Sequence, residues 1–311
     1  MNPYRIIFLG TPDFAVPSLV ALHQSNHQIP LVITQPDRPK GRGKKLQAPP
    51  VKKKARELGL NILQPQSVNT SECVAQIEAL NPDLLVVVAF GQLLKKSVLD
   101  ISKHGVLNVH PSILPKYRGP APIQWAIIDG CSETGVSIML LDEGLDTGDI
   151  LQIEQVVIDP EETAGMLHDR LSILGAQLLV DTINQLSNNS ISPDPQDHLL
   201  ATYARLLKKK DGQIQWSQPS QSILNFIRGM NPWPGAFTFL DNKRIKIFKA
   251  KKINVSEKAS PGTILNAFPD ELWIATGDGA ISILEIQSAS GKRMPIANFL
   301  RGNPLATGIT C

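Results

Sequence analysis

The sequence has only three cysteines, Cys73, Cys131 and Cys311, and they lie far apart in a chain of 311 residues. There is no CxxC pair, and no histidine stands at zinc-site spacing from a cysteine. A disulfide framework and a structural metal are therefore not expected. Free cysteines commonly behave as small apolar side chains. We expect these three to be buried in that way or to be exposed as a terminal thiol.

Long apolar runs and targeting signals are also missing. No uninterrupted apolar segment approaches the roughly 18 residues that suggest a membrane span. The N-terminus, MNPYRIIFLG, has neither a small-residue cleavage site nor an Arg/Ser-rich transit pattern. The sequence thus predicts a cytoplasmic protein without a membrane partner, and the lack of a transit peptide favours a bacterial source.

The common motifs of nucleotide cradles and hydrolases do not occur. The chain has no Walker A motif, no GxGxxG, no HExxH and no GxSxG. The nearest string, GRGKKL at 41–46, does not lead from a strand into a helix, which a phosphate-binding loop requires. A nucleotide cradle is therefore not supported, and most common hydrolases are excluded.

Charge is present in both signs but is unevenly distributed. The net charge is +3, with 42% hydrophobic and 19% charged residues, which is typical of a soluble globular protein. Residues 36–60 contain nine Lys/Arg and two acids, and residues 206–311 contain 14 Lys/Arg and seven acids, so each segment carries +7. The rest of the chain must carry −11. Two basic regions on an acidic body form the pattern expected of a protein that binds a polyanion, although a solvated lysine-rich loop beside an ordinary basic domain would give the same numbers.

The periodicity of the first half predicts strands that alternate with helices. Short aliphatic runs alternate with segments of helical spacing, and the run DLLVVVAF at 83–90 is typical of a parallel strand covered on both faces. This pattern favours an open, mostly parallel, doubly wound α/β sheet. A long amphipathic helix over 163–186 should complete it.

The second half has a different texture. The segment after residue 189 is polar and contains prolines, as linkers do. Beyond it, short strands separated by turn residues predict a smaller β-barrel of OB-like type. The length suits about two domains. We therefore expect a catalytic domain at 1–189, a linker at 190–207 and a C-terminal β domain at 208–311.

Three polar residues are candidates for chemistry. Asn108 and His110 are two positions apart in a predicted strand, so their side chains point to the same face at its carboxyl end, where α/β sheets bind ligands. An amide can stabilise a developing oxyanion, and a histidine titrates near neutral pH. Asp146, in the acidic loop 140–150, could orient the imidazole or move a proton. This set suits attack of a nucleophile on a carbonyl supplied by a second ligand.

The flanking residues resemble a known family. NVHPSILPKYRGPAPIQWAI followed by TGVSIMLLDEGLDTGDIL is similar to the signature of the folate-dependent formyltransferases, which use 10-formyltetrahydrofolate. The resemblance implies that Asn108, His110 and Asp146 are the catalytic residues. It also implies that a folate-contacting loop is formed by Ser112, Ile113, Leu114 and Pro115, and that residues 83–94 and the acidic loop wall the pterin pocket.

The remaining motifs resemble one group within that family. FLGTPDFAVPSLVAL, QPDRPKGRGKKLQAPPVKKKA and NPWPGAFT are similar to the members that formylate initiator methionyl-tRNA, and the likeness spans nearly the whole chain. It implies that the basic insertion enters the acceptor arm and that the C-terminal domain contacts the tRNA backbone. We separately expect the protein to act as a monomer. The insertion residues expected to contact tRNA are Lys40, Arg42, Lys44 and Lys45.

Two alternatives remain open at this stage. A formyltransferase acting on a sugar nucleotide amine or on glycinamide ribonucleotide would use the same three catalytic residues, but it gives no reason for the basic segments. A catalytically silent RNA-binding protein with a folate-like pocket would explain the charge, but not the Asn, His and Asp set.

Overall fold

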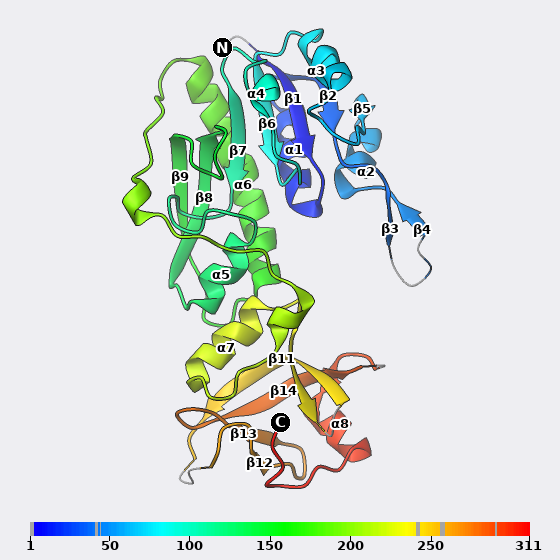
Figure 1. Ribbon diagram of the computed structural model, residues 1–311, viewed down its shortest axis with the longest axis vertical. Coiled ribbons are helices and arrows are strands. Elements are labelled where there is room, and N and C mark those ends of the chain that lie inside the picture. Colours follow the sequence, from blue (N-terminus) through cyan, green and yellow to red (C-terminus); the bar gives the residue numbers. More distant parts are fainter. Residues whose placement is uncertain (1–2, 41–42, 44, 241–242, 256–258, 290) are drawn as a thin grey trace. The chain divides into compact units, whose positions relative to one another are not determined.

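The computed structural model describes residues 3–40, 43, 45–240, 243–255, 259–289 and 291–311 (Figure 1). The chain forms two compact units. The first comprises Met1–Gly119, Thr134–Val156 and His168–Ala204, and the second comprises Pro120–Glu133, Val157–Leu167 and Arg205–Cys311. The second unit therefore consists of the C-terminal part of the chain and two short segments from earlier in the chain. The domain boundaries at residues 189 and 207 stay predictions.

The first unit is built on a seven-stranded sheet with the order β5-β2-β1-β6-β7-β8-β9. The pairs β1–β2, β2–β5, β1–β6 and β6–β7 are parallel, and β7–β8 is antiparallel. The strands are β1 (Arg5–Gly10), β2 (Gln28–Ile33), β5 (Ile62–Leu63), β6 (Leu84–Val88), β7 (Val106–His110), β8 (Glu133–Leu140) and β9 (Ile150–Val157). The predicted, mostly parallel α/β sheet is confirmed.

Burial explains why the central strands are aliphatic. All five residues of β6 are buried, as expected for a parallel strand covered on both faces. The helices between the strands are η1 (Asp13–Ala15), α1 (Val16–Gln24), α2 (Pro50–Glu57), α3 (Ser71–Glu78) and α4 (Lys96–Leu99), followed by α6 (Ala164–Ser187) and η2 (His198–Leu200). Helix α6 lies within one residue of the predicted 163–186 at each end. It approaches β7 closely, because a Cβ at Gly175 would lie 2.8 Å from Val109 Cγ1.

The second unit contains an antiparallel half-barrel. Its strand order is β10-β11-β14-β13-β12, with β15 paired to β14. The elements are α5 (Pro122–Ile128), η3 (Lys209–Gly212), α7 (Ser220–Gly229), β10 (Ala236–Leu240), β11 (Lys243–Ile253), β12 (Ile264–Asn266), β13 (Leu272–Ala275), β14 (Ala280–Ser288), β15 (Met294–Pro295) and α8 (Ile296–Gly302). Isoleucines from β11, β13 and β14 and one face of α7 form its core. The β-rich C-terminal domain expected from the sequence is therefore present.

The carboxyl ends of the parallel strands share one edge of the sheet. Between β2 and α2 the chain inserts a two-stranded hairpin, β3 (Arg38–Lys40) and β4 (Lys45–Gln47), which projects from this unit in Figure 1. Strand β7 ends at His110 on the same edge. Ligands of doubly wound sheets bind at this edge, so the fold brings the predicted catalytic strand and the root of the basic insertion to the same side.

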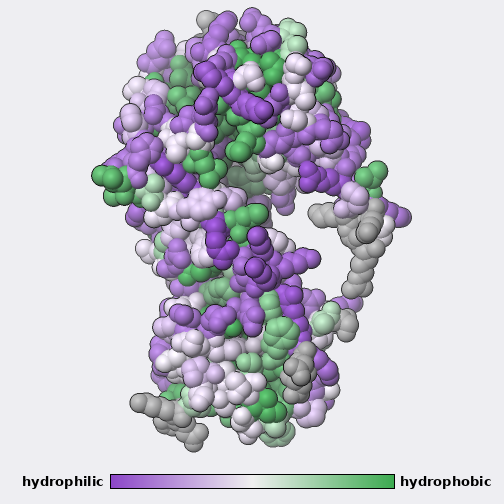
Figure 2. Space-filling model, in the orientation of Figure 1, coloured by the Kyte–Doolittle hydropathy of each residue, from purple (hydrophilic) through white to green (hydrophobic). Residues whose placement is uncertain are grey.

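Most of the visible surface is hydrophilic. Figure 2 shows apolar residues as separate small areas among hydrophilic ones. The largest exposed fractions of apolar residues belong to Leu199, Phe268 and Leu93. Among the described residues, no helix is both long enough and apolar enough to cross a membrane.

Gly135 of β8, which lies against the neighbouring strand β9, gives a stability prediction. A Cβ at Gly135 would lie 2.2 Å from the backbone oxygen of Glu154 on β9, which cannot move aside as a flexible side chain can. We expect Gly135→Ala to lower the free energy of unfolding by about 1–3 kcal/mol. Gly43→Ala is the control, because a Cβ there would meet nothing closer than 4.0 Å. Urea unfolding measures both, and equal stability of the two variants would contradict the packing described.

Candidate active site

Strand β7 places two polar side chains beside each other on one face. Asn108 pairs with Val87 of β6 and with Met139 of β8, so it lies in the middle of the sheet. His110 is the last residue of the strand, and only 4% of it is exposed. The alternation of a strand directs both side chains to one face, as the sequence predicted.

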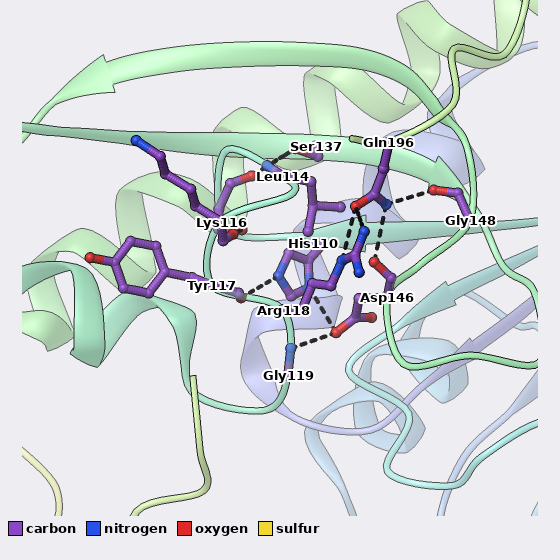
Figure 3. A network of polar contacts seen from close by, with 11 residues as sticks. His110, Leu114, Lys116, Tyr117, Arg118, Gly119, Ser137, Asp146, Gly148 and Gln196 are labelled. Carbon is purple, nitrogen blue, oxygen red and sulfur yellow. Dashed lines mark hydrogen bonds and ion pairs between the residues drawn. The ribbon is translucent and has the colours of Figure 1, made fainter. Parts of the chain in front are cut away.

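Both ring nitrogens of His110 face partners (Figure 3). Nε2 lies 3.0 Å from the backbone oxygen of Tyr117, and Nδ1 lies 3.6 Å from Asp146 Oδ2. A carbonyl oxygen can only accept, so Nε2 carries a hydrogen in this arrangement. A proton on Nδ1 would give a charge-assisted contact with the carboxylate, whereas the neutral ring would direct a lone pair at it. The carboxylate of Asp146 therefore lies where it can orient the imidazole.

Asp146 is held in an unusual backbone conformation. Its φ of 52° lies in the left-handed region, which aspartate adopts more readily than most residues. Its Oδ2 accepts a hydrogen bond of 2.7 Å from the amide of Gly119. The same oxygen faces His110, so the Gly119 amide fixes the position of the carboxylate that the imidazole meets.

A small pocket opens beside these residues. Its volume is about 180 Å³, and both Asn108 and Asp146 line it. The rest of the lining comes from the turn after β6 and from the acidic loop, and it consists of Val87, Ala89–Leu94, Leu99 and Leu141–Leu145. The structure thus brings together the two segments that the resemblance assigned to a pterin pocket.

The loop at Ser112–Pro115 directs two of its side chains, Ser112 and Leu114, into the protein interior. Ser112 is fully buried, and its hydroxyl donates to the backbone oxygen of Lys116. Ser137 Oγ donates to Ser112 O and accepts from the amide of Leu114. Of the described residues that line the 180 Å³ pocket, none belongs to this loop. Its contact with folate stays a prediction, and Ile113 and Pro115 are the two side chains of this loop that are not buried.

A second, larger pocket borders the first. It measures about 520 Å³ and shares Ala89, Phe90 and Gly91 with the smaller pocket. Its other walls are the turn after β1, the carboxyl end of β2 and the root of the hairpin: Thr11–Asp13, Gln35, Pro36, Arg38, Pro39, Gln47–Pro50 and Lys53. The turn after β6 is therefore a wall common to both pockets.

Two of the four predicted tRNA-contacting residues, Lys40 and Lys45, lie on the strands of the hairpin. Lys45 pairs with Lys40 across its two strands and is exposed. Arg42 and Lys44 lie outside the described residues, and only the backbone of Lys40 is described. The structure therefore places the insertion beside the larger pocket, while the roles of its four basic residues stay predictions.

An ion pair anchors the root of the hairpin. The ammonium of Lys52, on α2, lies 2.7 and 2.8 Å from the two carboxylate oxygens of Asp37, and the Lys52 side chain is 10% exposed. Gln64 Nε2 donates to Asp37 and to the backbone oxygen of Gln35. Hydrogen bonds from Lys52 and then from Gln64 lower the pKa of Asp37.

Sequence reasoning missed several residues around His110. Tyr117, Arg118 and Gly119 lie in the quoted signature without a predicted role, and Gln196 falls in the predicted linker. Arg118 donates to Gln196 Oε1 through Nε and Nη2, and Gln196 donates to the backbone oxygens of Asp146 and Gly148. A lone glutamine in a polar, proline-containing segment carries no local signal, so only the tertiary structure reveals its role.

Among the described residues, no group of three or more His, Cys, Asp or Glu is arranged to hold a metal.

The ion pair at the hairpin root gives a pH prediction. Because the folded state lowers the pKa of Asp37, its stabilising contribution is present above the unfolded value of about 3.9 and is lost as the pH falls through the lower folded value. Asp37→Asn should therefore lower the free energy of unfolding at pH 7 and lower it less at pH 3.5. In the control, Asp100→Asn, the change removes a pair with Lys96 in which both side chains are well exposed, so it should have little effect at either pH. If Asp37→Asn lowered the free energy of unfolding by the same amount at both pH values, this prediction would be contradicted.

Comparison with protein families gives two matches. Residues 4–183 match the family described as Formyl transferase, and residues 206–304 match Formyl transferase, C-terminal domain. Among curated proteins, the methionyl-tRNA formyltransferase of Geobacter metallireducens is 49% identical over 99% of this chain and 99% of its own length. That of Desulfotalea psychrophila is 50% identical over 96% of this chain and 92% of its own length.

Solved structures share the fold at lower identity. An N-formyltransferase from Helicobacter canadensis, in complex with folinic acid and dTDP-3-aminofucose, superposes with a TM-score of 0.68 at 19% identity and covers 94% of this chain and 100% of its own. HypX from Aquifex aeolicus in complex with tetrahydrofolic acid gives 0.66 at 17% identity, over 96% of this chain and 47% of its own. At this level of identity the likeness concerns the fold. The family matches and the near-full-length relatives carry the assignment, and the chain therefore belongs to the formyl transferase family, within its group of methionyl-tRNA formyltransferases.

Proposed function

We propose that this chain transfers the formyl group of 10-formyltetrahydrofolate to the α-amino group of methionine on initiator tRNA. The products are formylmethionyl-tRNA for translation initiation and tetrahydrofolate. The observation that carries the proposal is the His110 and Asp146 contact at the end of β7, beside a pocket that Asn108 also lines, in a chain 47–50% identical to methionyl-tRNA formyltransferases.

The chemistry assigns one task to each of the three polar residues. The amine nitrogen of methionine forms a bond to the formyl carbon, and the bond from that carbon to N10 of the folate breaks. Asn108 and His110 stabilise the oxyanion of the tetrahedral intermediate through hydrogen bonds. Asp146 holds His110 and accepts the proton that the amine loses, and that proton passes to N10 as folate leaves. Oriented proximity of two bound substrates can supply about 7–11 kcal/mol of the rate enhancement.

The two pockets suit two substrates. The 180 Å³ pocket receives the pterin end of the folate, and the 520 Å³ pocket receives the aminoacylated end of the tRNA. Support comes from the wall that the pockets share at Ala89–Gly91, since the reacting groups have to meet there. Arg38 and Lys53 in the larger pocket add positive charge near a phosphate backbone.

The tRNA partner accounts for the two basic segments. The insertion, with Lys40, Arg42, Lys44 and Lys45, contacts phosphates of the acceptor arm, and the basic half-barrel contacts the tRNA backbone elsewhere. We further propose that the enzyme acts as a monomer in the bacterial cytoplasm, where initiator tRNA is charged.

The alternative of a formyltransferase that acts on a small amine is weaker on one specific ground. The sugar N-formyltransferases and the glycinamide ribonucleotide transformylase resemble this chain at 17–23% identity, which supports a common fold alone. The deciding experiment is incubation with 10-formyltetrahydrofolate and charged initiator tRNA, followed by measurement of acid-precipitable formylmethionine. Formylation of a sugar nucleotide amine or of glycinamide ribonucleotide, without formylmethionyl-tRNA, would overturn the proposal.

His110 gives the first prediction from this mechanism. Replacing it with alanine should slow single-turnover formylation by about 10²–10⁴-fold, because the oxyanion loses a hydrogen-bond donor and Asp146 loses the group that it faces. Affinity for initiator tRNA should stay within about twofold of wild type, since binding rests on phosphate contacts. The exposed His23, on α1, provides the control His23→Ala. Near-normal formylation by His110→Ala would remove it from the mechanism.

The insertion gives the second prediction. Replacing Arg42, Lys44 and Lys45 with alanine should weaken tRNA binding. It should also reduce the slope of log affinity against log salt concentration by about 0.7–0.9 for each phosphate that the variant no longer neutralises. A control variant removes three lysines around α4, Lys95, Lys96 and Lys103, which are exposed. If both triple variants bind tRNA equally weakly, the effect is one of overall charge and the insertion has no specific role.

A further inference from the structure

We propose that Gln196 is a positioning residue of the active site, which holds Asp146 in the conformation that meets His110. The proposal rests on the proposed function, in which Asp146 is catalytic. The sequence predicts a linker around Gln196, yet Gln196 belongs to the first unit and is 6% exposed. A polar side chain this deeply buried needs partners, and its partners are parts of the site.

The carboxamide nitrogen of Gln196 spans the turn that carries Asp146. It donates to the backbone oxygen of Asp146 at 3.0 Å and to that of Gly148 at 2.6 Å (Figure 3). These two bonds lie on either side of Thr147, so one side chain fixes the backbone just where Asp146 adopts its left-handed φ of 52°. A non-glycine residue keeps such a φ only when its surroundings impose it.

The orientation of the carboxamide is set by a second group. Arg118 donates to Gln196 Oε1 through Nε at 3.0 Å and Nη2 at 2.6 Å. Because a guanidinium can only donate, the oxygen of the carboxamide must face Arg118, and the nitrogen must face the two backbone oxygens. Arg118 is itself 9% exposed and makes a further contact with His198 Nδ1 at 3.1 Å. The Arg118 guanidinium therefore determines which end of the Gln196 carboxamide accepts and which end donates.

The same segment also holds the other partner of His110. The amide of Tyr117 donates to Thr202 Oγ1 at 2.8 Å, and the amide of Arg118 donates to Thr202 O at 2.9 Å. The backbone oxygen of Tyr117 faces His110 Nε2. Residues 196–204 thus brace both sides of the imidazole, one through Asp146 and the other through Tyr117.

The test compares three variants in single-turnover formylation with saturating initiator methionyl-tRNA. Gln196→Met keeps the length of the side chain and removes its hydrogen bonds, and we expect the rate to fall at least about tenfold. The tRNA concentration that gives half the maximal rate, measured in a separate titration, should stay within about twofold of wild type. Gln196→Glu keeps the acceptor for Arg118 but loses the donor to Asp146 and Gly148, so it should be equally slow. Ser192→Met, an exposed position in the same segment, is the control and should behave as wild type.

The substitution Gln196→Met, made in an Asp146→Ala variant, separates a positioning role of Gln196 from an effect on general stability. If Gln196 acts through Asp146, adding Gln196→Met to Asp146→Ala should cause no further loss of rate, because its target is already absent. A further tenfold loss in that background would overturn the proposal. Wild-type rates in Gln196→Met, or in Gln196→Glu, would overturn it as well.

A readout without substrates keeps the proposal independent of the substrate assignment. The amide of Gly119 donates to Asp146 Oδ2, so it should exchange with solvent deuterium faster in Gln196→Met than in wild type or Ser192→Met. Unchanged exchange would contradict the brace even if the variant were slow. If wild type formylates no methionyl-tRNA, the proposed function fails, whereas the exchange of Gly119 still decides the role of Gln196.

Discussion

The contact between His110 and Asp146 is the constraint on which the site depends. Its 3.6 Å separation joins the last residue of a central strand to a loop that follows the next strand, β8. Strand β7 alone can aim an imidazole, but it cannot supply the carboxylate. The left-handed backbone at Asp146 and the amide of Gly119 turn that carboxylate back toward the strand. The fold is therefore required both to end β7 at the sheet edge and to hold the acidic loop against it.

The arrangement of charge follows from the size of the substrate. The pocket proposed for the pterin measures about 180 Å³, whereas a tRNA is far longer than any pocket. Phosphate contacts are long-range and insensitive to sequence, so they can be placed on a projecting hairpin. The pair of Lys52 and Asp37 then matters because it fixes the root of that hairpin beside the larger pocket. In the proposed function, this partly buried ion pair connects phosphate binding on the hairpin to the reacting groups.

Local pattern was enough to predict some features and not others. The aliphatic run of β6 and the helical spacing of α6 depend on neighbouring residues, so both elements were predictable from sequence. Asn108 and His110 share a strand, and alternation alone placed them together. The role of Gln196 depends on a buried arginine 78 positions earlier in the chain, and no periodicity reports such a contact. The inward-turned hydroxyl of Ser112 bonds to Lys116, only four positions away, but a loop has no periodicity from which that bond could be predicted.

A double-mutant cycle tests most directly whether His110 and Asp146 work as one unit. Single-turnover formylation of methionyl-tRNA is measured for wild type, His110→Asn, Asp146→Asn and the double variant, each with both substrates saturating. If the two residues share one task, the double variant should be no more than about threefold slower than the slower single variant. A loss in the double variant equal to the product of the two single losses would show that the residues act independently, and would contradict the central role of their contact.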